Sequence, residues 1–202
     1  MITINTRILK AEFEYFVPGT LGEALELINQ YSSHAKVIAG GTDLLVQMKQ
    51  EVISPRYLVD ISKIPEMKFI RKEKGWLKIG AATKWSEIVE FCAKNQKYAA
   101  LDEASRSLGK VQVQSMATIG GNLCTASPAA DSAPALLVSN CRVKLANIQG
   151  ERILDLEDFF QGVNETTKNN NEIMTEVQIP PVHDGVGSAF MKITRVGADI
   201  SK

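Results

Sequence analysis

Cysteine and histidine are scarce in this chain of 202 residues, which contains three cysteines and two histidines. Cys92, Cys124 and Cys141 match no CxxC spacing and are odd in number. A disulfide framework, an iron–sulfur cluster or a structural zinc site within this chain is therefore a poor fit. His34 and His183 give neither a His-based metal site nor a Ser–His–Asp constellation. Free thiols make the reducing cytoplasm the expected compartment.

An excess of charge of either sign is also lacking, because 23 Lys and Arg residues balance 23 Asp and Glu residues. The absence of a basic excess argues against a nucleic-acid binder and against a polybasic membrane anchor. No apolar run approaches the roughly 18 residues of a transmembrane helix, and no signal-peptide pattern is present. The composition is that of a globular protein, with 45% hydrophobic and 23% charged residues.

Helix and strand patterns alternate over the first sixty residues. Thr20 and Glu23 fit a capping box, and apolar residues at helical spacing predict a helix over 21–31. Short apolar runs predict strands at 36–39 and 57–61, with a second helix after residue 43. This alternation favours a small parallel sheet.

The pattern changes after residue 64. Runs at 68–70 and 76–79 predict a β-hairpin, and Thr83 is the expected cap of a helix that reaches Asn95. The other expected elements are helices at 101–108 and 133–139, an acidic helix start at 154–160, and strands at 142–146, 172–179 and 189–193. We expect three units: 1–64, 65–181 and 182–202, the last being the start of a further domain.

Two similar segments each place a glycine pair after an apolar or β-branched run and before a polar side chain. They are Val37, Ile38, Ala39, Gly40, Gly41, Thr42 and Asp43, and then Thr118, Ile119, Gly120, Gly121 and Asn122. Both are interpreted as loops whose backbone N–H groups can approach phosphate oxygens closely, because glycine has no Cβ. Asp43 would not favour phosphate, so it is expected to cap the helix or to form hydrogen bonds elsewhere.

Each glycine pair has a simpler interpretation as a tight turn, and neither matches GxGxxG or the P-loop pattern. The second pair is followed by small residues with spaced polar groups, among them Thr125, Ser127 and Asp131. Asp131 suits a ribose diol, although Ser127-Pro128 equally fits the start of a helix. No acid–base constellation accompanies these loops, so the pattern indicates a phosphate-bearing cofactor that supplies the chemistry itself.

These residues resemble the FAD-binding subunit or domain of the molybdenum hydroxylases, the family of xanthine dehydrogenase and carbon monoxide dehydrogenase, also called molybdopterin dehydrogenases. The resemblance covers roughly residues 13–200. The matching segments are Phe16–Pro18, Ile38–Leu44, Leu77–Ala81, Ala117–Asp131, and Glu172–Met174 with Ile179-Pro180.

The resemblance implies an α+β fold of the vanillyl-alcohol-oxidase-like type, with a small α/β subdomain, a larger and mainly antiparallel subdomain, and FAD between them. It implies that Lys36 to Asp43 wrap the FAD diphosphate and that Thr118 to Asn122 complete this cradle. Thr125, Ser127 and Asp131 would lie along the ribityl and ribose side. Ile173 or Met174 would contact the flavin ring through its backbone, with Lys192 nearby.

The resemblance also implies an oxidoreductase component without catalytic side chains or metal ligands of its own. A large molybdopterin subunit would oxidise the substrate. A small subunit with two 2Fe–2S clusters would pass electrons to FAD, which would deliver them to NAD or another acceptor. The alternatives are a truncated, cofactor-free structural or assembly module and, ranked last, a stand-alone flavin oxidase. Family members continue past residue 202 into a C-terminal domain.

Overall fold

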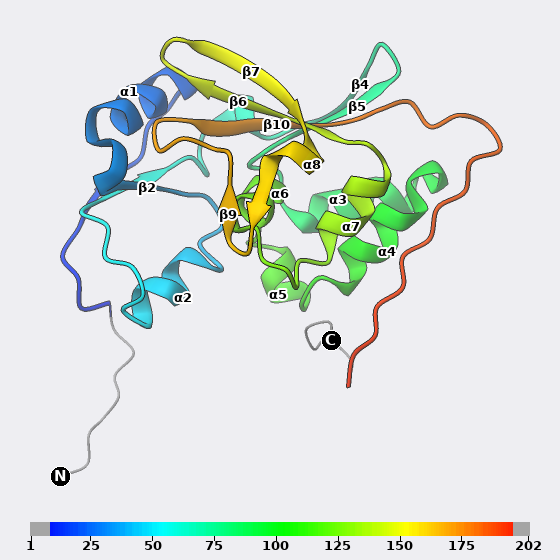
Figure 1. The fold of residues 1–202 in the computed structure, drawn as a ribbon, viewed down its shortest axis with the longest axis horizontal. Helices are drawn as coiled ribbons and strands as arrows, with labels where there is room; N and C mark the ends of the chain where they lie inside the picture. The colour runs from blue at the N-terminus through cyan, green and yellow to red at the C-terminus, as the bar shows by residue number, and fades with distance from the viewer. Residues whose placement is uncertain (1–8, 196–202) are drawn as a thin grey trace.

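The computed structural model describes residues 9–195, which build two sheets with helices packed between and around them (Figure 1). The first sheet has three parallel strands in the order β1-β3-β2. Its strands are β1 (Glu14–Phe16), β2 (Ala35–Ile38) and β3 (Tyr57–Asp60). Helices α1 (Leu21–Tyr31) and α2 (Leu44–Lys49) connect them, which confirms the predicted small parallel sheet.

Helix α1 begins and ends where the sequence predicts. The Thr20 hydroxyl accepts a hydrogen bond from the Glu23 N–H, and the Glu23 carboxylate accepts one from the Gly19 N–H. Ala24 and Ile28 face the core and are fully buried. The local capping groups and the apolar stripe therefore specify the same helix.

The second sheet has five antiparallel strands in the order β4-β5-β10-β6-β7. Its strands are β4 (Ile70–Glu73), β5 (Trp76–Gly80), β6 (Arg142–Asn147), β7 (Gly150–Asp155) and β10 (Ile173–Ile179). Strand β10 lies at the centre and is buried along its whole length. With the parallel sheet beside it, this arrangement confirms the predicted α+β class.

Helices cover one side of the five-stranded sheet and lie below it in Figure 1. They are α3 (Trp85–Ala93), α4 (Ala99–Ser107), α5 (Val111–Gln114), α6 (Ile119–Thr125) and α7 (Ser132–Val138), followed by the short α8 (Leu156–Phe159). A two-stranded ribbon, β8 (Phe160–Gly162) with β9 (Glu165–Thr166), completes the fold. No helix in the described range 9–195 is long and apolar enough to cross a membrane.

One hydrophobic core joins the two sheets. Ile28 of α1, Val59 of β3, Trp85 of α3 and Val177 of β10 belong to the same buried cluster. The expected division of the chain at residues 64 and 181 remains a prediction. The buried cluster includes residues from both sides of position 64.

Three predicted elements differ in the structure. Thr83 does not cap a helix, because its hydroxyl exchanges hydrogen bonds with the Phe69 backbone; α3 instead begins after Lys84. The second glycine pair lies inside helix α6 rather than in a loop. Strand β7 occupies residues expected to lie outside strands, and because it is an exposed edge strand it lacks a strong apolar pattern.

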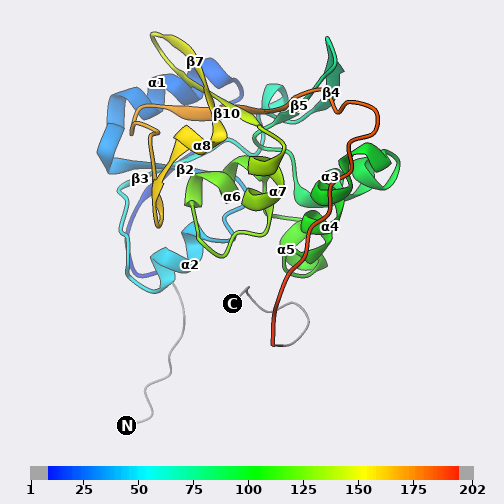
Figure 2. The same ribbon diagram turned by 45° about the vertical axis from the view of Figure 1, so that its right-hand side comes forward.

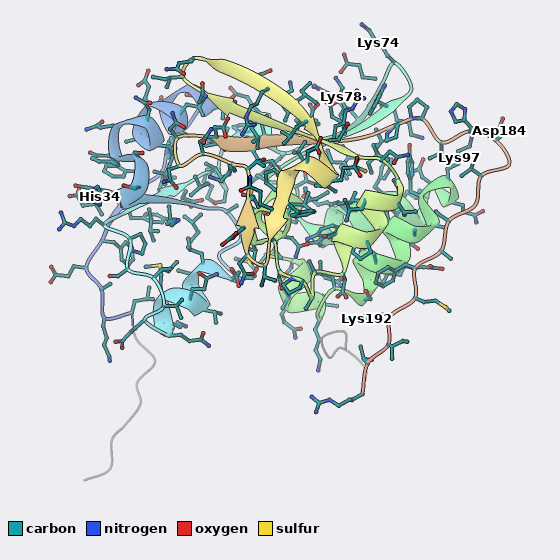
Figure 3. The ribbon with its side chains drawn as sticks, in the orientation of Figure 1. His34, Lys74, Lys78, Lys97, Asp184 and Lys192 are labelled. Atoms are coloured by element: carbon teal, nitrogen blue, oxygen red, sulfur yellow. The ribbon has the colours of Figure 1, made fainter. Side chains whose placement is uncertain are left out.

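The expected strand at 189–193 is also absent from the described residues. This segment is extended and runs along α4 without a strand partner. The Ser188 hydroxyl accepts a hydrogen bond from the Ala100 N–H, and the Phe190 N–H donates to the Glu103 carboxylate. Figure 3 shows Asp184 beside Lys97, with which it forms a 2.9 Å ion pair, and Lys192 further along the same segment. Residues 196–202, the end of the expected third unit, lie outside the described residues.

Candidate functional site

A cavity of about 510 Å³ brings the two glycine segments together. The end of β2 and the start of α2 form one wall, and α6 with the segment up to Asp131 forms another. Figure 2 shows β2, α2 and α6 near one another in the fold. The turn before β10 and the first residues of that strand close the third side. Its volume lies within the range typical of pockets for small molecules and cofactors.

The first glycine segment is a turn that leads from β2 into α2. Gly40 touches the backbone of residues 116 and 117: a Cβ there would lie 2.0 Å from the Met116 carbonyl oxygen. Gly41 has φ +67°, a left-handed conformation that glycine adopts without strain. Both glycines are therefore required by the shape of the turn.

The backbone N–H groups of this turn indicate which ligand groups it can bind. Among the hydrogen bonds within residues 9–195, none has the N–H of residues 39–44 as its donor. Six successive N–H donors thus line the cavity without an acceptor in the part of the chain that the structure describes. Such a row suits the oxygens of a phosphate or diphosphate group.

The second glycine segment is built differently. The Thr118 hydroxyl caps α6 by accepting a hydrogen bond from the Gly121 N–H at 3.2 Å. The Gly120 N–H donates to the Ala81 carbonyl at 2.9 Å, and the N–H groups of Ile119 and Asn122 also have acceptors in the protein. The expectation of a second row of free N–H groups is therefore wrong. Gly121 still exposes its backbone to the cavity, because only the Thr118 hydroxyl lies near its missing Cβ.

Side-chain contacts connect the two walls. Asp43 precedes α2 but makes no capping hydrogen bond; its carboxylate accepts from Gln47 and, at 3.2 Å, from the Thr125 hydroxyl of α6. Asn122 accepts a hydrogen bond from the Ser132 hydroxyl. The second of the two roles expected for Asp43, hydrogen bonding away from the helix start, is confirmed.

Asp131 and Lys192 form a pair at the edge of the cavity. The Lys192 ammonium lies 2.9 Å from Asp131 Oδ2, and the Asp131 side chain is 8% exposed. The other carboxylate oxygen, Oδ1, is buried and has no hydrogen-bond partner among the described residues. Since a buried acceptor without a donor is costly, Oδ1 marks a position where a ligand hydroxyl would be stabilised.

The cavity includes seventeen of the nineteen residues expected from the sequence to bind the cofactor. It excludes Ile119, which is fully buried in the core, and Lys192, which reaches the site only through Asp131. The lining also contains Gln47, Lys168 and Asn170, which the sequence did not single out as ligand-binding residues. Residues 168–171 were interpreted only as a polar turn, because nothing in that stretch shows that it faces the glycine segments.

The turn before β10 is fixed by an ion pair between the buried Glu172 and the exposed Arg152. Nε and Nη2 of Arg152 donate to the Glu172 carboxylate, at 2.7 and 2.8 Å, and Nη2 also donates to the Thr167 carbonyl. Burial tends to raise the pKa of Glu172, but the hydrogen bonds from Arg152 and from the Asn169 N–H hold that pKa below its ordinary value. Glu172 is therefore a charged anchor of the turn rather than a proton donor near neutral pH.

The donors and acceptors of the cavity fit a dinucleotide. The free N–H groups at 39–44 suit an anionic diphosphate, and the unpartnered Asp131 oxygen suits a sugar or ribityl hydroxyl. Apolar surface from Ile38, Ala117 and Met174 lines the space between polar groups. Residues 11–182 match the family described as the FAD binding domain in molybdopterin dehydrogenase. The chain belongs to this family. Its cofactor is accordingly FAD.

Several characterised relatives resemble this FAD-binding domain over nearly all of its length. The carbon monoxide dehydrogenase medium chain of Hydrogenophaga pseudoflava is 32% identical over 192 residues, which are 95% of this chain and 67% of the relative. The nicotinate dehydrogenase FAD-subunit of Eubacterium barkeri is 36% identical over 190 residues, covering 91% of this chain and 64% of the relative. The chain thus spans about two thirds of the length of these relatives.

Solved structures agree with the fold. The structure of carbon monoxide dehydrogenase from Hydrogenophaga pseudoflava that lacks the Mo-pyranopterin moiety superposes with a TM-score of 0.89 at 32% identity. The match covers 96% of this chain and 68% of that one. Reconstituted carbon monoxide dehydrogenase from Oligotropha carboxidovorans gives a TM-score of 0.91 at 28% identity.

Proposed function

We propose that this chain is the electron-transfer flavin component of a molybdenum hydroxylase complex. In this proposal it takes electrons from the 2Fe–2S clusters of a small partner subunit, while a large molybdopterin subunit oxidises the substrate. The electrons pass to NAD or another acceptor. The observation that carries the proposal is the row of free backbone N–H groups at 39–44, because it faces a cavity that both glycine segments share.

The chain's own residues would bind and orient the cofactor. The N–H groups of the Gly40-Gly41 turn would donate to the diphosphate, and Gly121 would allow close backbone approach from the opposite wall. Thr125, Ser127 and Asp131 would face the ribityl and ribose hydroxyls, with the Lys192 ammonium holding the Asp131 carboxylate in place. Ile173 and Met174 would support the ring system through the backbone of β10. Bound FAD supplies the electron-carrying chemistry.

Relatives are consistent with this role. They include subunits named for carbon monoxide, nicotinate and xanthine dehydrogenases, so the complex is proposed to be a dehydrogenase of that general type. The cavity contains no His, and no group of three metal-ligating side chains occurs within residues 9–195. Substrate selection is therefore assigned to the partner that would hold the molybdenum cofactor.

Cofactor analysis of the purified chain tests the proposal. We expect a yellow protein that releases FAD on denaturation and is bleached by dithionite. A protein that is colourless and takes up no added FAD would favour the cofactor-free assembly module. Copurification of cluster-bearing and molybdopterin-bearing subunits from the native host tests the partner assignment separately.

A further inference from the structure

Lys168 is a half-buried lysine at the cavity that forms no ion pair with an acidic residue within residues 9–195. Its side chain lines the cavity from the turn before β10. The nearest candidate, Glu172, is already occupied by Arg152 and by the Asn169 N–H. An ammonium group held near a cavity without a counter-ion is a costly arrangement unless a ligand supplies the missing charge.

Hydrogen bonds fix the position of this ammonium. Lys168 Nζ donates to the carbonyl oxygens of Asn169 at 3.0 Å and Glu172 at 3.3 Å. An ammonium group carries three N–H donors, and the third has no acceptor among the described residues. The Arg152–Glu172 pair fixes the same turn, so the free donor is held in place at the cavity wall rather than on a flexible side chain.

A second lysine, Lys36, lies near Lys168 at the cavity. Burial lowers the pKa of Lys168, and the charge of Lys36 on the neighbouring strand β2 lowers it as well, whereas Cys124 and Glu172 act in the opposite direction. Lys36 also lines the cavity, a few residues before the free N–H groups at 39–44. Two cations and a row of backbone donors thus converge on one region, and the charge that they can neutralise together is an anion.

We propose that Lys168 is a further cofactor-binding residue, whose third ammonium N–H pairs with the diphosphate bridge of the dinucleotide from the third side of the cavity, formed by the turn before β10. This inference rests on the proposed binding of FAD in the cavity and adds a charged contact to it. The diphosphate is the charged part of FAD near neutral pH, so it is the ligand group that an unpaired ammonium would select.

The test measures FAD dissociation constants at low and high salt for wild type and for three variants of Lys168. Lys168→Gln keeps N–H donors for the carbonyls of Asn169 and Glu172 but removes the positive charge. Lys168→Met removes the donors as well as the charge. Lys168→Arg restores the charge. Lys97→Met is the matched control, because Lys97 is an exposed lysine paired with Asp184 away from the cavity (Figure 3).

A charged hydrogen bond in a partly dry site corresponds to about a ten- to hundredfold change in affinity. We expect Lys168→Gln and Lys168→Met to lose FAD affinity by this factor. Their FAD affinity should also depend less on salt than that of wild type. Lys168→Arg should recover most of the affinity, and Lys97→Met should match wild type.

Other results would overturn the inference. A wild-type chain that binds FAD while Lys168→Gln binds it within twofold, or with the same salt dependence, would show that Lys168 makes no charged contact. A wild-type chain that takes up no FAD would overturn the proposed function itself. Thermal unfolding without FAD separates binding from folding, because Lys168→Gln keeps donors for the two carbonyls and should leave the melting temperature unchanged.

Discussion

The two glycine pairs are alike in sequence but have different structural roles. Gly40-Gly41 forms an open turn whose N–H groups have no acceptors within residues 9–195, whereas Gly120-Gly121 lies in the first turn of α6, where each N–H has one. Within each pair, one glycine permits close packing: Gly40 against the Met116 backbone and Gly120 against Ala81. The difference teaches that a shared dipeptide does not imply a shared role in ligand binding.

The contact between the two segments also explains why they share a cavity. The carbonyl of Met116, two residues before the Thr118 cap, lies directly against Gly40. Thr125, at the end of α6, reaches Asp43 at the start of α2. The open turn and the capped helix are therefore locked together at both ends, and the cavity lies between them.

The largest expected effect comes from Gly40→Ala. The new Cβ would meet three backbone atoms of residues 116 and 117 at 2.0–2.9 Å, and none of them can move without shifting the start of α6. We expect a loss of more than about 3 kcal/mol in the free energy of unfolding. Urea denaturation measures this loss, and a variant within about 1 kcal/mol of wild type would contradict the close contact of the two segments.

Adjacent substitutions at the second pair should separate packing from binding. Gly120→Ala places a Cβ 2.6 Å from the Ala81 Cβ, and we expect it to cost about 2 kcal/mol of stability. Gly121→Val meets only the Thr118 hydroxyl, at 3.0 Å, so the protein should remain folded while FAD retention is lost. Denaturation and FAD content after desalting give the two readouts. If Gly121→Val retained FAD at wild-type stoichiometry, the assignment of α6 to the cradle would be wrong.

A smaller effect is expected at the helix cap. Thr118→Ala removes the acceptor of the Gly121 N–H and should destabilise the protein by about 1 kcal/mol. Thr42→Ala is the matched change in the first segment, where Thr42 is exposed and makes no capping bond; it should lie within about 0.5 kcal/mol of wild type. Urea denaturation measures the free energy of unfolding of both variants. Equal losses of this free energy would contradict the distinction between a capped helix and an open turn.

The smallest effect is expected for Cys124→Ser, a change at a half-buried position that lines the cavity. FAD retention should match wild type. Burial raises the pKa of the Cys124 thiol despite the nearby Lys168, so the reactive thiolate is scarce at pH 8. Iodoacetamide should therefore modify Cys124 slowly in the folded protein. Fast modification would contradict the raised pKa of this thiol, and loss of FAD in the serine variant would show that the side chain contacts the cofactor.

Local signals predicted those elements whose capping and packing groups are close in sequence. The Thr20–Glu23 box defined α1, and the chain-reversing residues between 73 and 76 defined the β4–β5 hairpin. Prediction failed where contacts with residues distant in the sequence, rather than the local pattern, decided the structure. Thr83 looked like a helix cap but bonds to Phe69, and the 189–193 segment has strand-forming residues but no neighbouring strand. The sequence did not predict the edge strand β7, because its pairing with β6, rather than an apolar face, holds it in place.

The sequence by itself determined the chemistry of the site, since the glycine pairs, the hydroxyl run and Asp131 are visible without coordinates and indicate a phosphate-bearing cofactor. Only the tertiary structure decided which backbone donors are free, because that depends on acceptors such as Ala81 that lie far away in the chain. It also placed Lys168 at the cavity. The insertion of β10 between β5 and β6 brings its turn beside β2 and α6, and a long-range pairing of this kind leaves no local signal in the sequence.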